Sequence, residues 1–149
     1  MNLGIDIGST TVKLVIVRSE DGSVAASMYR RHNAAQVETL REMLLELLPY
    51  FPLDDMYAAV CGSGAKPVAK ALGIPYIQEV IANATAVGRL YPQVRTAIEL
   101  GGQDAKVVFF STNPQTGACE PNDMRMNGSC AGGTGAFIDE IASLLKVPP

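Results

Sequence analysis

Residues 4–13 read Gly-Ile-Asp-Ile-Gly-Ser-Thr-Thr-Val-Lys, an apolar strand that breaks at a glycine turn and resumes as a second strand. Asp6 stands near the end of the first strand, where a carboxylate is costly unless it holds a cation or a proton-bearing partner. The turn offers consecutive backbone N–H groups and short hydroxyls, which suit a loop that closes on a phosphate chain. These groups come from Gly8, Ser9, Thr10 and Thr11.

The same stretch also fits an ordinary Gly-Ser hairpin turn. It is not a P-loop, because no Gly-x-x-x-x-Gly-Lys-Ser/Thr occurs and the turn leads into a strand that carries Lys13 instead of into a helix. Phosphate binding therefore depends on what the rest of the chain supplies.

Composition indicates a packed globular protein, with 48% hydrophobic and 18% charged residues over 149 positions. This length predicts one domain or two small lobes. A net charge of -3 and the absence of a Lys/Arg cluster give no support for nucleic-acid binding. No apolar run approaches the ~18 residues that a membrane span needs, and the N-terminus lacks the basic segment of a secretory signal.

The numbers of cysteines and histidines further limit the kinds of site that this chain can form. The three cysteines, Cys61, Cys119 and Cys130, form no C-x-x-C pair and no disulfide framework, so we expect a reducing cytoplasm. His32 is the single histidine, which excludes His-rich zinc sites and histidine-based triads within this chain.

Periodicity predicts an α/β fold with a mixed sheet and flanking helices. Strands are expected at 2–7, 12–18, 24–31, 56–61, 75–77, 95–100 and 105–111. Helices are expected at 35–49, 66–72, 79–90 and 131–145, with Gly73 as the C-cap of the second.

A second stretch, Glu99-Leu100-Gly101-Gly102-Gln103-Asp104-Ala105-Lys106, repeats the design of the first. An apolar strand ends near a carboxylate, glycines follow, and polar side chains stand on the returning strand. Alone it fits a glycine-rich hairpin. Two such turns indicate paired phosphate loops that grip the β- and γ-phosphates from opposite lobes.

A third stretch, residues 126–137, reads Met-Asn-Gly-Ser-Cys-Ala-Gly-Gly-Thr-Gly-Ala-Phe. Cys130 stands before a glycine turn at a predicted helix start, where the helix dipole favours the thiolate. Thiolate is the form that ligates iron–sulfur clusters. A small buried cysteine in a tight turn is the alternative.

In their order and spacing the three stretches resemble the acyl-CoA dehydratase activators, the family of 2-hydroxyacyl-CoA dehydratase activases and benzoyl-CoA reductase ATPase subunits. The resemblance implies a ribonuclease-H-like, actin-like ATPase lobe and a homodimer with one interface [4Fe–4S] cluster. It also implies that ATP hydrolysis drives a low-potential electron to a dehydratase or reductase partner, with ferredoxin or flavodoxin as the electron donor.

Carried onto this sequence, the resemblance makes Cys130 a cluster ligand and gives Asp6 and Glu99 contact with Mg²⁺, mostly through water. Asp6, Gln103 and Asp104 are the expected catalytic residues, with Gln103 or Asp104 orienting the attacking water. ATP or ADP is expected to contact Gly8, Ser9, Thr10, Thr11, Lys13, Gly101, Gly102 and Lys106.

The chain is expected to hold one complete lobe, residues 1–94, and the beginning of a second similar lobe, residues 95–149. The second cluster cysteine and the adenine pocket are expected beyond Pro149, so this stretch alone should be weak or inactive. Two departures from the family pattern are Glu99, often Asp, and Gly132, often Ala.

Two other functions remain open from the sequence. A small-molecule kinase of the same superfamily would keep its activity when Cys130 is replaced by Ala, whereas an activator would lose its cluster. A non-hydrolysing nucleotide-binding module would show no ATPase activity that depends on Asp6.

Overall fold

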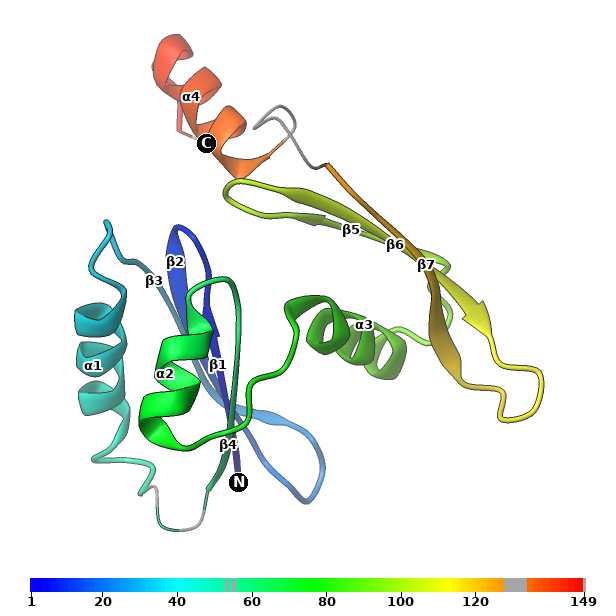
Figure 1. Cartoon of the computed structure of the whole chain (residues 1–149), viewed down its shortest axis with the longest axis horizontal. Coiled ribbons are helices and arrows are strands. Elements are labelled where there is room, and N and C mark those ends of the chain that lie inside the picture. The colour runs from blue at the N-terminus through cyan, green and yellow to red at the C-terminus, as the bar shows by residue number, and fades with distance from the viewer. Residues whose placement is uncertain (53, 55, 128–133, 149) are drawn as a thin grey trace. The chain divides into compact units, whose positions relative to one another are not determined.

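The computed structural model describes residues 1–52, 54, 56–127 and 134–148 (Figure 1). The chain divides into two compact units, Met1–Glu79 and Val80–Pro149, and each is described by itself. The lobe boundary expected at residue 94 stays a prediction.

The first unit is an α/β layer built on a four-stranded sheet. Strand order is β3-β2-β1-β4, with β1 antiparallel to β2 and parallel to β4. Two hairpins followed by a crossover to a parallel strand confirm the predicted mixed sheet with flanking helices. Its elements are β1 (Asn2–Ile7), β2 (Thr11–Val17), β3 (Val24–Arg31), α1 (Gln36–Leu47), β4 (Tyr57–Cys61) and α2 (Ala65–Leu72).

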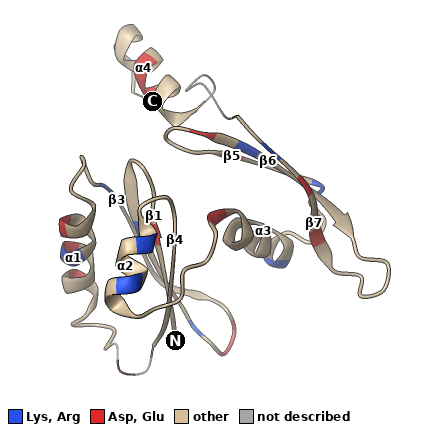
Figure 2. Cartoon of the chain, viewed as in Figure 1, with Lys and Arg blue, Asp and Glu red and all other residues tan. Residues whose placement is uncertain are grey.

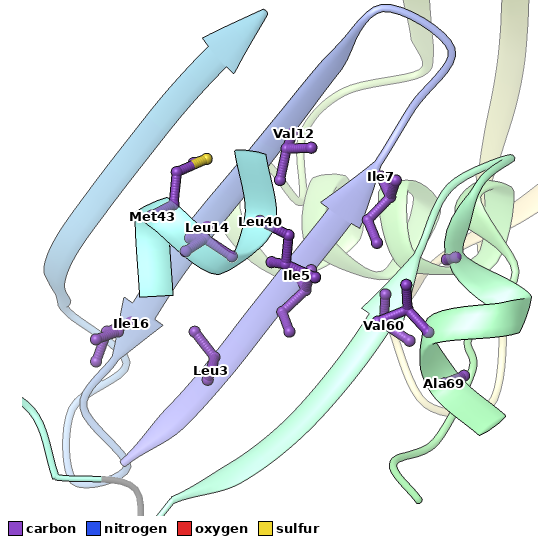
Figure 3. Packing of buried hydrophobic residues seen from close by; sticks show 12 residues of the cluster. Leu3, Ile5, Ile7, Val12, Leu14, Ile16, Leu40, Met43, Val60 and Ala69 are labelled. Atoms are coloured by element: carbon purple, nitrogen blue, oxygen red, sulfur yellow. The ribbon is translucent and has the colours of Figure 1, made fainter. Parts of the chain in front are cut away.

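One face of this sheet carries the main core because strand side chains alternate between faces. Leu3, Ile5 and Ile7 of β1 are buried, and α1 and α2 contribute Met43 and Ala69 (Figure 3). Each fully buried aliphatic side chain contributes about 1.5–3 kcal/mol. The strands β1 and β2, which flank the first glycine turn, are therefore well packed in the core.

Charged residues occur along α1 and α2 (Figure 2). Arg30 of β3 forms ion pairs with Glu46 at 3.0 Å and Glu42 at 3.7 Å, which join β3 to α1. These groups are exposed, so each pair is worth only about 0.2–1 kcal/mol. Hydrophobic packing, more than charge, fixes the helices on the sheet.

The segment after α2 differs from the sequence prediction in one respect. Gly73 takes the left-handed C-cap conformation with φ 65°, as expected. The strand predicted at 75–77 is reduced to one parallel bridge between Val60 and Tyr76. Because Pro75 has no N–H, it cannot extend the ladder as a donor.

The second unit is an antiparallel sheet, in the order β5-β6-β7, with two helices. Its core is small and centres on Ala84, Val108 and Phe110. No helix in the described parts of the chain is both long and apolar enough to cross a bilayer. The elements are α3 (Glu79–Leu90), β5 (Thr96–Leu100), β6 (Ala105–Thr112), β7 (Cys119–Met126) and α4 (Gly135–Leu145).

Strand β7 was not predicted from the sequence. Its residues, Cys-Glu-Pro-Asn-Asp-Met-Arg-Met, lack alternation and are nearly all exposed. A proline such as Pro121 is tolerated at an edge strand, and here it sits beside a register shift at Phe109/Phe110. The helix predicted from residue 131 is described from Gly135, and residues 131–133 lie outside the described part.

Candidate functional site

The first glycine turn connects β1 to β2 and places a carboxylate beside a lysine. Asp6 and Lys13 are cross-strand partners, and Lys13 Nζ donates to Asp6 Oδ2 at 2.7 Å. The carboxylate is 21% exposed and the lysine 44% exposed. The pair is therefore reachable from solvent, next to the turn that connects β1 to β2.

The second carboxylate oxygen of Asp6, Oδ1, differs from the first in its surroundings. Oδ1 is buried and accepts no hydrogen bond from any residue that the structure describes. A buried carboxylate oxygen without a donor is costly, and a hydrated cation would relieve that cost. Mg²⁺ binds through one or two carboxylates, waters and phosphates. The chemistry of this position fits such an ion, with Asp6 as its protein ligand directly or through water.

The turn itself presents unused backbone donors. Gly8 N–H donates to the carbonyl of Thr11 at 2.9 Å, which closes the turn. Within the described residues, the backbone N–H groups of Ser9 and Thr10 have no acceptor. Thr11 is buried, whereas Ser9 and Thr10 are half-buried. Successive free amides of this kind form an anion-binding surface.

The loop after β4 lies against Asp6. The sequence pattern did not predict this contact. Gly62 has φ +102°, and a Cβ there would overlap the carbonyl of Ile7 and crowd Asp6 Oδ1. Gly64 N–H donates to that same Ile7 carbonyl at 2.9 Å. Gly62 therefore allows the β4–α2 loop to pack against the end of β1.

The ion pair with Asp6 changes the titration of Lys13. Partial burial lowers the pKa of Lys13, but the hydrogen bond and charge of Asp6 together outweigh it, with smaller contributions from Tyr29 and Glu79. The net result is a pKa above the ordinary value of 10.5.

This shift predicts a loss of stability at high pH. A raised folded-state pKa stabilises the fold fully below pH 10.5, and the contribution disappears as pH rises through the folded pKa. Because Lys13 is 44% exposed, we expect no more than about 1 kcal/mol. Unfolding free energies of wild type and Lys13→Met, measured from pH 9 to pH 12, should converge at the alkaline end. If the difference in unfolding free energy between the two proteins stays constant across this range, the pKa of Lys13 is not raised in the way described.

The second glycine turn connects β5 to β6 and repeats the arrangement. Glu99 and Lys106 are cross-strand partners, as Asp6 and Lys13 are. Lys106 Nζ lies 3.4 Å from Glu99 Oε1 and 3.4 Å from Asp104 Oδ2. Unlike Lys13, Lys106 is only 4% exposed. Lys106 therefore holds two carboxylates from a buried position, whereas Lys13 holds one and is partly exposed.

Close packing within this turn requires a glycine at Gly101. Gly101 N–H donates to the Asp104 carbonyl at 2.8 Å, and a Cβ at Gly101 would overlap the Asp104 side chain. The carbonyls of Gly101 and Gly102 accept from the first amides of α4, Gly135 at 2.8 Å and Ala136 at 3.1 Å. The second turn is thus tied to the start of α4, and Gln103 is exposed beside it.

The buried position of Lys106 predicts a large stability effect. Lys106→Met leaves Glu99 and Asp104 close together without this counter-charge, and breaking a buried ion pair from one side costs about 3–5 kcal/mol. We expect the lower end, because the two carboxylates are 23% and 41% exposed. The matched variant Lys13→Met should cost less than about 1 kcal/mol. Equal losses in denaturant unfolding would contradict the difference in burial.

Cys130, the expected cluster ligand, lies outside the described residues. Cys119 is half-buried, with Sγ 3.6 Å from the Val94 carbonyl, and Cys61 ends β4 as the strand partner of Asp6.

The mixed sheet of the first unit and the antiparallel sheet of the second, each with a glycine turn between two of its strands, fit an actin-like ATPase fold. The chain belongs to the BadF/BadG/BcrA/BcrD ATPase family, whose model matches residues 3–148.

Individual relatives support the same classification. The (R)-2-hydroxyglutaryl-CoA dehydratase activating ATPase of Acidaminococcus fermentans is 28% identical over 97% of this chain and 54% of its own length. The crystal structure of component A of the dehydratase from that organism superposes with a TM-score of 0.81 at 28% identity, covering 99% of this chain and 54% of that one. A Clostridium difficile activator of 2-hydroxyisocaproyl-CoA dehydratase, solved with bound ADPNP, has a TM-score of 0.76 at 28% identity, covering 99% and 53%. The chain spans about half the length of the curated relatives it matches.

Proposed function

We propose that the full-length protein carrying this chain binds and hydrolyses ATP, and that hydrolysis drives electron transfer to an acyl-CoA dehydratase or a related reductase. The observation that carries the ATP part is the repeated hairpin, in which a carboxylate–lysine pair stands beside a glycine turn. Relatives named as dehydratase activators, one of them solved with ADPNP, support the proposal.

In the first hairpin, the Ser9 and Thr10 amides would bind phosphate oxygens, and Lys13 would neutralise charge that develops during transfer. Asp6 would hold Mg²⁺, which supplies positive charge beside the phosphates. Phosphoryl transfer depends mainly on positioning and electrostatic stabilisation of this kind. The half-buried hydroxyls and amides of Ser9 and Thr10 would meet that requirement without a covalent step.

In the second hairpin, Gly101 and Gly102 would line the phosphates and Gln103 would orient the attacking water. Gln103 is the better of the two predicted candidates because Asp104 is already engaged by Lys106. Glu99 would contact Mg²⁺ through water. Lys106 would act by holding Glu99 and Asp104 in place.

The redox part of the proposal rests on family membership. Cys130 would be one ligand of a [4Fe–4S] cluster shared by two subunits, and the cluster supplies one-electron chemistry at low potential. A ferredoxin or flavodoxin would deliver the electron in a reducing cytoplasm.

Replacing Cys130 tests the redox part separately from ATP binding. Full-length protein purified without oxygen should contain iron and sulfide, and Cys130→Ala should lose both while keeping its affinity for ATP. Cys119→Ala, a half-buried cysteine in β7, is the matched control and should keep the cluster. Iron and sulfide retained in Cys130→Ala would contradict the assignment. Phosphorylation of an added acceptor by a cluster-free variant would favour a kinase.

A further inference from the structure

His32 occupies a buried position directly behind the first glycine turn. It is 4% exposed, and both ring nitrogens have backbone partners. The Ala34 N–H donates to Nδ1 at 3.0 Å, and Nε2 lies 3.3 Å from the Gly8 carbonyl oxygen. A backbone N–H can only donate, so Nδ1 carries no proton in this arrangement. The ring is then the neutral tautomer with its proton on Nε2, which donates to Gly8.

The backbone around His32 is arranged to hold the ring in this orientation. Asn33 and Ala34 both have left-handed φ values, 46° and 69°, which are uncommon outside glycine. This turn brings the Ala34 N–H back onto Nδ1. The main chain of His32 also donates to the Thr10 carbonyl at 3.2 Å. Unfavourable backbone geometry that persists at a site is a reason to look for a role there.

The bond to Gly8 has a consequence for the turn. In a trans peptide the C=O of one residue and the N–H of the next point in opposite directions. When the Gly8 carbonyl is held toward His32, the Ser9 N–H of the same peptide must point away from His32. That N–H has no acceptor among the described residues.

We propose that His32 is a positioning residue for phosphate binding: through the Gly8 carbonyl it fixes the orientation of the Ser9 amide toward the bound nucleotide. The inference rests on the proposed function, because it assigns a role within the same phosphate turn. It adds a residue that touches neither phosphate nor metal.

Two substitutions separate the two ring contacts. In His32→Gln the side-chain amide can reach the position of Nε2 and still donate to Gly8, whereas in His32→Asn the amide oxygen can replace Nδ1 but no donor reaches Gly8. Binding of ADPNP with Mg²⁺ to the full-length protein is measured by calorimetry. We expect affinity to fall about fivefold to tenfold in His32→Asn, the effect of one lost hydrogen bond, and less than about threefold in His32→Gln.

The outcomes distinguish this inference from the proposed function. Wild type that binds no nucleotide overturns both. Wild-type affinity in a folded His32→Asn, or equal losses in both variants, overturns the role of His32 alone. If His32→Asn does not fold, the inference is tested instead by determining which imidazole tautomer His32 adopts in the wild-type protein. A long-range ¹H–¹⁵N spectrum, with the signal assigned by its loss in His32→Gln, should show the proton on Nε2, and a proton on Nδ1 overturns the inference.

Discussion

Asp6→Asn in the full-length protein is expected to lower the kcat of ATP hydrolysis about a hundred- to thousandfold, the usual loss when one preorganised electrostatic group is removed. Asparagine has nearly the same shape and can still accept from Lys13, so the hairpin should persist. What it removes is the charge on Oδ1, the buried oxygen for which no donor is found among the described residues. Steady-state phosphate release at saturating Mg²⁺ and ATP measures the effect.

Glu20→Gln is the matched control for Asp6→Asn. It also removes one negative charge, but from the exposed turn between β2 and β3. We expect its kcat to stay within about twofold of wild type, because exposed charges at a distance are screened. Equal rates in wild type and Asp6→Asn would contradict a catalytic role for Asp6. Absence of ATPase activity in the wild type would favour a non-hydrolysing nucleotide-binding module.

Gly62→Ala is expected to destabilise the first unit by about 2–5 kcal/mol. A side chain at φ +102° is strained, which costs at least about 1–2 kcal/mol. The added Cβ would also overlap the Ile7 carbonyl, and overpacking against rigid backbone costs a further 1–3 kcal/mol, roughly. Because the same Cβ crowds Asp6 Oδ1, any folded fraction should bind Mg²⁺ and ATP more weakly.

Gly73→Ala provides the comparison for Gly62→Ala. Gly73 also has a positive φ, 65°, but a Cβ there would meet nothing within 4 Å. Only the strain of placing a side chain at positive φ applies here, so the expected loss of stability is about 1 kcal/mol. Denaturant unfolding of both full-length variants gives the two values. Similar costs at the two positions would show that the β4–α2 loop does not pack tightly on β1.

The elements around the first turn could be predicted because local pattern and tertiary packing agree there. Leu3, Ile5 and Ile7 alternate in the sequence and are all buried in the structure. The same holds for the glycine that ends α2, since only a residue tolerant of positive φ fits that C-cap. Strand β7 could not be predicted, because a polar edge strand is fixed by its hydrogen bonds to β6 instead of by buried side chains.

The candidate site was predictable in its residue types but not in its supporting contacts. A carboxylate, a glycine turn and a lysine recur in both hairpins, and this repetition is visible in the sequence. The burial of Lys106 is not visible in the sequence, because Lys106 and the partly exposed Lys13 occupy the same position in their hairpins. The proposed role of His32 could not be predicted either, because a lone histidine after a strand carries no local signal. The contacts of its ring nitrogens with Gly8 and Ala34 show how the ring is held.

A crystal structure of the full-length protein with ADPNP and Mg²⁺ tests the central claim most directly. We predict that phosphate oxygens accept hydrogen bonds from the backbone N–H groups of Ser9 and Thr10, with Mg²⁺ within direct or water-mediated reach of Asp6. We also predict phosphate contacts at Gly101 and Gly102. Nucleotide bound with its phosphates away from both glycine turns would contradict the account.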